Sequence, residues 1–244
     1  MNNNLNYRTA DEKEIQKFSK LSEDWWNEKG KFKPLHEFNP VRLKYIIREI
    51  KKHFKINSDQ DLPFKNLSII DVGCGGGLVT EPMARLGAKI TGIDASINNI
   101  EAAKLHAKKM SLNIDYNVNT PENINNSYDV ILCLEIIEHV SDVNLFIKSC
   151  EKILKKNGII FFATLNRTIK SFVYAIIGAE YILNWLPKGT HNWNKFIKPS
   201  ELTLICNKLN LKLLEIAGFS YSILQRHWYQ GDLLNINYIM VFKK

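Results

Sequence analysis

Short apolar runs alternate with helical segments from residue 67 onward, and this alternation constrains the fold more than any other feature. The runs with strand character are residues 67–70, 89–93, 114–118, 128–134 and 158–164. The helical patterns between them lie at residues 79–86, 98–110 and 143–154. Strands that alternate with helices predict an α/β fold with a doubly wound parallel sheet. Two more apolar runs, 211–216 and 237–242, predict an antiparallel finish and bring the sheet to seven strands.

The N-terminal quarter of the chain has helical spacing. Apolar residues recur at three- and four-residue steps over 11–29 and over 41–54, which predicts two amphipathic helices. Residues 32–40 contain two prolines and are predicted to form a loop, with Asn39 and Pro40 at the start of the second helix. We expect residues 1–60 to form a helical lid.

The segment 166–198 lies outside the alternation of strands and helices. It is therefore predicted to be an inserted helical segment with a separate function. The whole chain, residues 1–244, is expected to form one domain.

The stretch from Ile69 to Gly77 joins the first predicted strand to the first predicted crossover helix and reads Ile-Ile-Asp-Val-Gly-Cys-Gly-Gly-Gly. Glycines let a backbone approach a ligand closely, and the start of the next helix offers free N–H groups. A nucleotide-like ligand is therefore expected here. The dinucleotide fingerprint requires a third glycine at position 78, where the chain has Leu78, so the NAD interpretation fails. A tight turn with a purely structural role is the alternative.

The remaining pattern, D-x-G-x-G-x-G from Asp71 to Gly77, resembles motif I of class I S-adenosylmethionine-dependent methyltransferases. In proteins of that class an acidic residue at the end of the next strand holds the ribose hydroxyl groups of the cofactor. Asp94 ends that predicted strand. The resemblance therefore implies a Rossmann-like methyltransferase fold.

Glu135, Glu138 and His139 directly follow the fourth predicted strand. If a helical turn begins there, the three side chains stand at positions i, i+3 and i+4 and share one face. Two carboxylates and an imidazole suit Mg, Mn, Fe or Zn, whereas His139 alone could act as a general base near neutral pH. Three interpretations remain open: a metal centre, acid–base catalysis without a metal, and a structural role.

Two further motifs are more specific than the glycine turn: Lys33-Pro34-Leu35-His36 and Gly178-Ala179-Glu180-Tyr181-Ile182-Leu183. With them, the chain resembles the ubiquinone biosynthesis O-methyltransferase family, whose members methylate ring hydroxyl groups of polyprenylated phenols and catechols. The resemblance runs through nearly the whole chain and is weak only over residues 223–234. It implies the strand order 3-2-1-4-5-7-6 and S-adenosylmethionine as the cofactor.

Positions in the motifs imply residue roles. The residues assigned to the cofactor are Arg42, Asp71, Gly73, Gly75, Asp94 and Leu134. Arg42 can pair with the methionine carboxylate, Asp94 with the ribose, and Leu134 can line the adenine slot. The resemblance implies that a divalent metal ion, with Mg²⁺ as the first choice, binds to Glu135, Glu138 and His139. The same three residues are the predicted catalytic residues. His36 either covers the cofactor or is an ordinary loop histidine.

Composition excludes several classes of protein. With 45% hydrophobic and 24% charged residues, the chain is neither disordered nor a coiled coil. It has no apolar run of about 18 residues, and its polar start fits neither a secretory signal nor a transit peptide, so a cytoplasmic location is expected, with peripheral contact at the inner membrane. Its four cysteines form no CxxC pair and are expected to be reduced thiols.

The net charge of +8 leaves acidic lipid, RNA and a polyanionic substrate open as partners. A nucleic-acid partner is not predicted, because Glu135 to His139 stand where amino-methylating enzymes carry an Asn-Pro-Pro-Tyr type of motif. The expected partners are a polyprenylated phenol or quinol and, through residues 166–198, an anionic membrane surface. The same amphipathic stripe could instead wall the pocket.

Two other functions stay open as alternatives. The chain could methylate a different small molecule or a nucleic acid, or it could bind cofactor or lipid without turnover as a partner of other ubiquinone-biosynthesis proteins.

Overall fold

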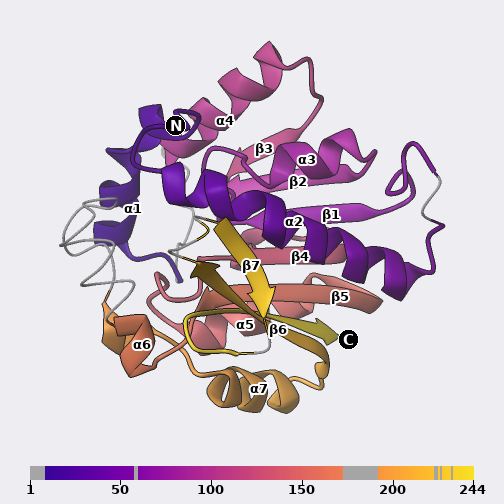
Figure 1. Ribbon diagram of the computed structural model, residues 1–244. Helices are drawn as coiled ribbons and strands as arrows, with labels where there is room; N and C mark the ends of the chain where they lie inside the picture. The colour runs from indigo at the N-terminus through magenta and orange to yellow at the C-terminus, as the bar shows by residue number, and fades with distance from the viewer. Residues whose placement is uncertain (1–8, 58–59, 173–191, 223–224, 226, 232) are drawn as a thin grey trace.

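The structure is a computed structural model that describes residues 9–57, 60–172, 192–222, 225, 227–231 and 233–244. Within these residues the centre is one eight-stranded sheet with the order β3-β2-β1-β4-β5-β8-β6-β7 (Figure 1). Its strands are β1 (Ser68–Val72), β2 (Lys89–Asp94), β3 (Asp115–Val118), β4 (Tyr128–Leu134), β5 (Leu154–Leu165), β6 (Lys212–Ser222), β7 (His227–Gly231) and β8 (Asn237–Lys243).

The sheet is mixed, as predicted. The strands from β3 to β5 are parallel to one another, whereas β8 is antiparallel to both of its neighbours, β5 and β6. The predicted order and the antiparallel last strand are therefore confirmed. The strand missing from the prediction is β7, which forms an antiparallel hairpin with β6 at the sheet edge. Its residues are half-buried or exposed, so no apolar run marks it in the sequence.

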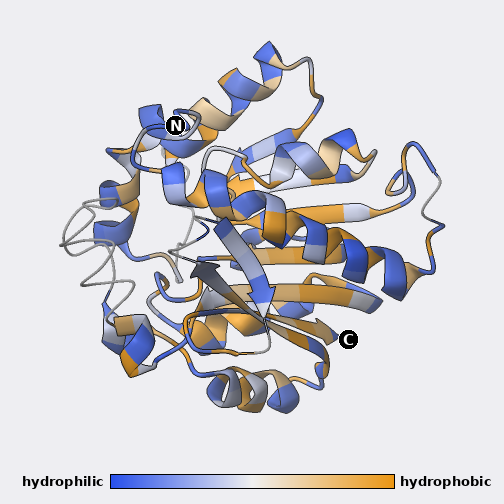
Figure 2. Cartoon of the chain, viewed as in Figure 1, coloured by the Kyte–Doolittle hydropathy of each residue, from blue (hydrophilic) through white to orange (hydrophobic). Residues whose placement is uncertain are grey.

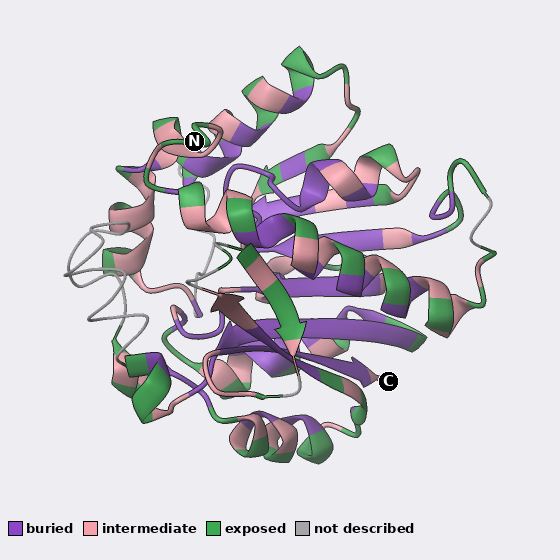
Figure 3. Cartoon of the chain, viewed as in Figure 1, coloured by how far each residue is buried: buried purple, intermediate pink, exposed green. Residues whose placement is uncertain are grey.

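Strand side chains alternate between two apolar layers. In β5, Ile159 and Phe161 face the layer that holds α2 (Lys33–Phe54) and α3 (Thr80–Arg85), whereas Ile160 and Phe162 face α5 (Val143–Lys152) and α7 (Pro199–Lys208). Helix α4 (Ile97–Lys109) packs on β2 and β3. Figures 2 and 3 show the central strands as apolar and buried. Because both faces are covered, these strands are continuous apolar runs in the sequence.

Helix α2 corrects the prediction of a loop over residues 32–40, because it begins at Lys33 and continues through Pro40. Pro34 lies in the first turn, where a backbone N–H would have no helical partner. Pro40 lies inside the helix and removes one backbone hydrogen bond. Burial of side chains such as Ile46 against the sheet outweighs this loss, since each large apolar side chain contributes about 1.5–3 kcal/mol when buried.

The first helix is shorter than the predicted 11–29. Helix α1 spans Glu12–Ser19. Asp11 is its N-cap, and the Asp11 side chain accepts a hydrogen bond from the Lys13 N–H. A 3-10 turn, η1 (Ser22–Asp24), follows it. The chain bends there and reaches the glycine turn with two tryptophans, as described below.

The remaining short elements are η2 (Pro121–Asn123), α6 (Ile169–Ser171) and η4 (Trp193–Lys195). The last two belong to the predicted insertion 166–198, of which residues 173–191 lie outside the described residues. No helix in the described parts of the chain is both long enough and apolar enough to cross a bilayer.

Candidate cofactor and acceptor site

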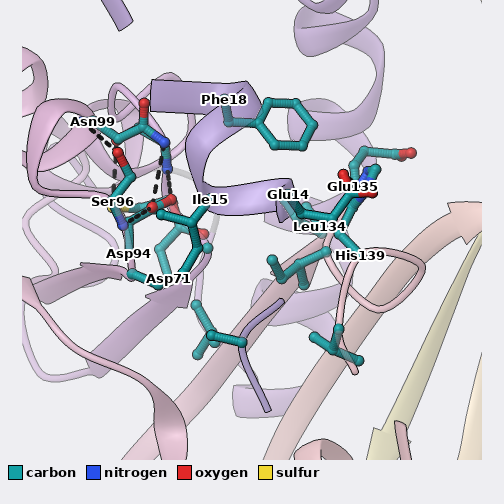
Figure 4. Close-up of a pocket in the computed structure, with 18 of the residues that line it drawn as sticks. Glu14, Ile15, Phe18, Asp71, Asp94, Ser96, Asn99, Leu134, Glu135 and His139 are labelled. Atoms are coloured by element: carbon teal, nitrogen blue, oxygen red, sulfur yellow. Dashed lines mark hydrogen bonds and ion pairs between the residues drawn. The ribbon is translucent and has the colours of Figure 1, made fainter. Parts of the chain in front are cut away.

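A pocket lies at the carboxyl ends of β1, β2 and β4, where the strand order reverses between β1 and β4 (Figure 4). In doubly wound sheets this reversal is the usual place for a ligand. Every residue predicted for the cofactor or for catalysis lines the pocket: Arg42, Asp71, Gly73, Gly75, Asp94, Leu134, Glu135, Glu138 and His139. His36 lies apart from this set, and its Nε2 is 2.8 Å from the carbonyl oxygen of Trp25.

The glycine turn forms the floor between β1 and α3. Gly73, Gly75 and Gly77 have φ angles of +76°, +53° and +89°, which residues with side chains rarely adopt. A Cβ atom at Gly75 would lie 2.4 Å from the ring of Trp25, and one at Gly73 would lie 2.8 Å from Ile136. Glycine is therefore required both for the backbone conformation and for the close packing on either side of the turn.

Asp94 ends β2 and supports the turn from the side. Its carboxylate accepts hydrogen bonds from the N–H of Gly75 at 3.0 Å, the N–H of Ser96 at 2.8 Å and the side-chain amide of Asn99 at 3.3 Å. Burial raises the pKa of Asp94 above its ordinary value, and the two N–H donors oppose this shift. A carboxylate offers about four lone-pair positions, so Asp94 retains capacity for a ligand hydroxyl.

Arg42 is a buried cation beside two carboxyl groups. It projects from α2, only 4% of its surface is exposed, and its Nε donates to Asn39 Oδ1 at 2.7 Å. Asn39 in turn donates to the Leu78 carbonyl oxygen at 2.8 Å, so this residue fixes Arg42 rather than starting the helix. Burial lowers the pKa of Arg42, while the charges of Glu135 and Asp71 oppose the shift. This arrangement suits an incoming carboxylate.

Asp71 is buried at the end of β1 and accepts a hydrogen bond from the Thr80 hydroxyl at 2.6 Å. Burial raises the pKa of Asp71 to about 6, although the Thr80 hydrogen bond and the charge of Arg42 both lower it. The carboxyl group thus connects the glycine turn to the first turn of α3.

The residues after β4 form a turn and no regular helix. Glu135 has a φ angle of +55°, and the His139 N–H donates to the Ile136 carbonyl oxygen at 2.9 Å. Glu138 is buried, and its Oε2 accepts a hydrogen bond from Thr164 at 2.8 Å. Burial, followed by the nearby Glu135 carboxylate, raises the pKa of Glu138 well above its ordinary value. Glu138 therefore holds a proton more tightly than an exposed glutamate does.

The side chain of His139 meets the N-terminal helix. Its Nδ1 lies 3.1 Å from Glu14 Oε2, and its ring packs edge-on against Phe18 with a centroid distance of 5.0 Å. Figure 4 shows Glu14 beside His139 on one side of the pocket and the Asp94 network on the other. We call the side at Asp94 the cofactor half and the side at His139 the acceptor half, after the roles that the sequence predicts for these residues.

The predicted metal centre is not formed by the described residues. Among them, no three His, Cys, Asp or Glu side chains come together in a way that could hold a metal ion. The donor types suit a hard divalent cation, and Glu138 Oε1 is buried without a hydrogen-bond partner. The Glu138 Oε2 and His139 Nδ1 atoms, however, already interact with Thr164 and Glu14. The side chains as placed therefore do not fit a metal ion, and metal binding stays a prediction.

Two tryptophans that precede α2 contact the glycine turn and its surroundings. Trp25 stacks on Phe32 with a centroid distance of 3.8 Å, and its N–H donates to Asn99 Oδ1 at 2.9 Å. Trp26 donates to the Gly76 carbonyl oxygen at 2.9 Å and stacks on the ring of His106 at 3.4 Å. The N-terminal segment is thus anchored directly at the cofactor half of the pocket.

Sequence reasoning missed several lining residues. They are Glu14, Ile15, Phe18 and Trp25 from the N-terminal segment, Ser96 and Asn99 after β2, and Asn119, Thr120 and Pro121 after β3. Ser96 carries a signal in the sequence, because serine is a preferred residue at the start of a helix, and its hydroxyl accepts from the Asn99 N–H. The residues of α1 carry only an amphipathic pattern.

Comparison with known proteins gives a consistent family. A family model described as a methyltransferase domain matches residues 38–216. The chain is 56% identical to the "Ubiquinone biosynthesis O-methyltransferase" of Pelagibacter ubique over 97% of this chain and 99% of that protein. It is 48% identical to the protein of that name from Bartonella tribocorum, over 97% of each chain. The corresponding protein of Paramagnetospirillum magneticum is 44% identical over 95% of this chain and 94% of its own.

Solved structures share the fold at low sequence identity. Magnesium protoporphyrin IX methyltransferase from Synechocystis, with bound S-adenosylhomocysteine, superposes with a TM-score of 0.60 at 16% identity over 83% of each chain. A SAM-dependent methyltransferase from Aquifex aeolicus superposes with a TM-score of 0.61 at 12% identity, over 94% of this chain and 97% of its own. Both likenesses concern the fold alone.

Proposed function

Because this chain belongs to the ubiquinone biosynthesis O-methyltransferase family, we propose that its pocket transfers a methyl group from S-adenosylmethionine to ring hydroxyl groups of polyprenylated phenols. It is an S-adenosylmethionine-dependent O-methyltransferase of ubiquinone biosynthesis. The proposed acceptors are 2-polyprenyl-6-hydroxyphenol and 3-demethylubiquinol, the latter giving ubiquinol. The observation that carries the proposal is the meeting of Asp94 and His139 in one pocket.

The cofactor half is proposed to bind S-adenosylmethionine through four contacts. Arg42 pairs with the methionine carboxylate, Asp94 accepts the ribose hydroxyl groups, and Leu134 packs on the adenine. Gly73 and Gly75 let the backbone pass close to the cofactor, while Asp71 supports the turn through Thr80. Burial of Arg42 supports the first contact, because a buried guanidinium is stable only with anionic or hydrogen-bonding partners.

The acceptor half is proposed to generate and align a phenolate. A phenol with a pKa near 10 is a poor nucleophile at neutral pH, so the site must remove its proton. In the proposed reaction the hydroxyl proton passes to the His139 imidazole and the oxygen attacks the methyl carbon in line with the carbon–sulfur bond, which breaks. The products are the aryl methyl ether, S-adenosylhomocysteine and a proton. Alignment by the pocket walls supplies much of the remaining rate.

The family resemblance also implies Mg²⁺ or another divalent ion at Glu135, Glu138 and His139. When bound, such an ion would stabilise the phenolate electrostatically. The described side chains do not group around an ion, so the mechanism above contains no step through one.

Contact with an anionic membrane is proposed for the segment 166–198, because a polyprenylated acceptor resides in lipid. Ile169 is 81% exposed and Phe172 is 41% exposed, with Lys170 between them. Exposed apolar and basic side chains on a short helix favour an interfacial contact. Two flanking cations already have partners, since Arg167 pairs with Glu201 and Lys195 with Asp11. The proposed location is the cytoplasm, peripheral to the inner membrane.

Transfer of a labelled methyl group tests the function directly. The purified chain should label a polyprenyl catechol and a demethylubiquinol from labelled S-adenosylmethionine. Labelling of RNA or DNA in place of the catechol would overturn the substrate class. Cofactor binding without transfer to any acceptor would favour a non-catalytic assembly partner of other ubiquinone-biosynthesis proteins.

A further inference from the structure

We infer that Glu14, in the N-terminal helix α1, is a positioning residue that orients His139 for proton transfer. The inference rests on the proposed function, because it assigns a role toward the histidine that is proposed to take the acceptor proton. It adds to the acceptor half of the pocket a residue that lies 125 positions from His139 in the sequence.

Contact geometry supplies the first argument. Glu14 Oε2 lies 3.1 Å from His139 Nδ1, within hydrogen-bond distance. Phe18, one helical turn further along α1, packs edge-on against the same ring at a centroid distance of 5.0 Å. Consecutive turns of one helix thus hold the imidazole by its nitrogen and by its edge. Both side chains also line the pocket, so the contact lies where the acceptor must bind.

Charge supplies the second argument. A glutamate side chain is ordinarily ionised at neutral pH. An ionised carboxylate can accept a hydrogen bond but cannot donate one.

The consequence concerns which imidazole nitrogen carries the proton. Beside a carboxylate acceptor, Nδ1 must be the donor, so in the neutral ring Nε2 holds the lone pair. Carboxylates that accept from one nitrogen of a catalytic histidine fix both its tautomer and its ring orientation. Glu14 thereby directs the basic nitrogen of His139 away from α1.

Contacts other than that of Glu14 anchor α1, so the role proposed for Glu14 is more than attachment of the helix. The segment is held independently by Thr9, which donates to the Glu122 carboxylate at 2.8 Å, by Ser19 at Ser96, and by Lys195 at Asp11. Loss of the Glu14 carboxylate therefore leaves the helix fastened at both ends. Glu12 provides a matched control, because it is an exposed glutamate of the same helix.

The experiment combines kinetics with nitrogen NMR of the full-length protein. In wild type, the neutral His139 ring should show the Nδ1–H tautomer. Glu14→Ala should lose that tautomer preference and lower kcat by about 10- to 100-fold, while KM for S-adenosylmethionine stays unchanged. Glu14→Gln, whose amide oxygen can still accept from Nδ1, should recover part of kcat. Glu12→Ala should behave as wild type.

Three results would overturn the inference: an Nε2–H tautomer in wild type, an unchanged kcat in Glu14→Ala, or an equal loss in Glu12→Ala. The double variant Glu14→Ala, His139→Ala should be no slower than His139→Ala alone, because Glu14 acts through that ring. If wild type methylates no polyprenyl acceptor, the proposed function fails, whereas the tautomer measurement still decides whether Glu14 orients His139.

Discussion

The acidic side chains of the pocket each depend on a particular neighbour. Asp94 is supported by backbone and amide donors, Asp71 by the Thr80 hydroxyl, and Glu138 by the Thr164 hydroxyl. Arg42 is the buried cation among them. S-adenosylmethionine carries a sulfonium and an ammonium against one carboxylate, so it enters as a net cation, whereas S-adenosylhomocysteine has lost the sulfonium charge. An acidic pocket therefore favours the substrate form of the cofactor over the product form.

Replacing Asp94 with alanine should weaken cofactor binding. The change removes the acceptor for the ribose hydroxyl groups and leaves them unpaired, at a cost of about 1–3 kcal/mol in binding free energy. Calorimetry with S-adenosylhomocysteine would measure the dissociation constant. Asp115→Ala, at an exposed position of β3, is the control. An unchanged dissociation constant in Asp94→Ala would remove Asp94 from the cofactor site.

The raised pKa of Asp71 predicts a pH-dependent stability. Its pKa rises from an ordinary value of 3.8 to about 6 in the folded protein, so its contribution is fully present below pH 3.8 and is lost as the pH rises through about 6. Asp71→Asn keeps an acceptor for Thr80 and cannot ionise. Its stability relative to wild type should therefore increase between about pH 4 and 6, by an amount on the order of 2 kcal/mol. Urea unfolding at several pH values would test this, and parallel curves would contradict it.

His139→Ala should affect turnover far more than cofactor affinity, with a loss in kcat of about 100-fold or more. The reason is that the imidazole faces the acceptor half of the pocket, away from Asp94. Chelation separates the two explanations for that loss. A metal-dependent enzyme should lose turnover on exhaustive chelation and regain it with Mg²⁺. Full turnover of the chelated enzyme beside an inactive His139→Ala variant would leave the general-base role.

At the scale of elements, α1 and α2 show where the sequence pattern does not predict the structure. Residue types with strong chemical preferences, such as Arg42 and Asp94, could be assigned to the pocket because strand ends and motif positions place them. The contacts of Glu14 and Trp25 could not, since an amphipathic pattern reports that a helix is half-buried and not what covers it. The prolines of α2 led to the wrong prediction of a loop for a related reason. Proline has a low helix propensity, but packing on the sheet maintains the helix.

The exposed apolar residues at α6 predict vesicle binding. Changing both Ile169 and Phe172 to serine should abolish co-sedimentation with anionic vesicles and lower the melting temperature only slightly, because Ile169 is 81% exposed and Phe172, 41% exposed, loses one ring contact with Trp193. Leu105→Ser is the matched control, since Leu105 is 72% exposed on α4, remote in sequence from the insertion. Equal sedimentation of the double variant and wild type, or no binding by wild type, would rule out this membrane contact.

At the scale of the whole molecule, the sheet was predictable because its central strands are buried on both faces, and the family resemblance implied their order. The edge hairpin of β7 was not, because its half-exposed side chains leave no apolar run. The described residues also show no metal cluster at Glu135, Glu138 and His139, where the family resemblance implied one. Spacing places donor atoms along the chain, but hydrogen bonds with Thr164 and Glu14 decide where those atoms point.

Cofactor binding should stabilise the folded chain as a unit. S-adenosylhomocysteine at about 100 times its dissociation constant should add about 2.7 kcal/mol to the free energy of unfolding. Hydrogen exchange should slow in the N-terminal segment as well as in the glycine turn, because Trp25 and Trp26 join the two. Protection confined to the glycine turn would contradict this connection.

One short segment touches both halves of the pocket, with Ser19 and Trp25 at the cofactor half and Glu14 at the acceptor half. If binding of one reactant orders this segment, the affinity for the other reactant should rise. By thermodynamic reciprocity, each reactant should then raise the affinity of the other by the same factor. Binding of the water-soluble cofactor and binding of the lipid-soluble phenol would in this way be coupled through the segment, before the two molecules contact each other. Cooperativity between two chemically unrelated substrates would then reside in one short N-terminal segment.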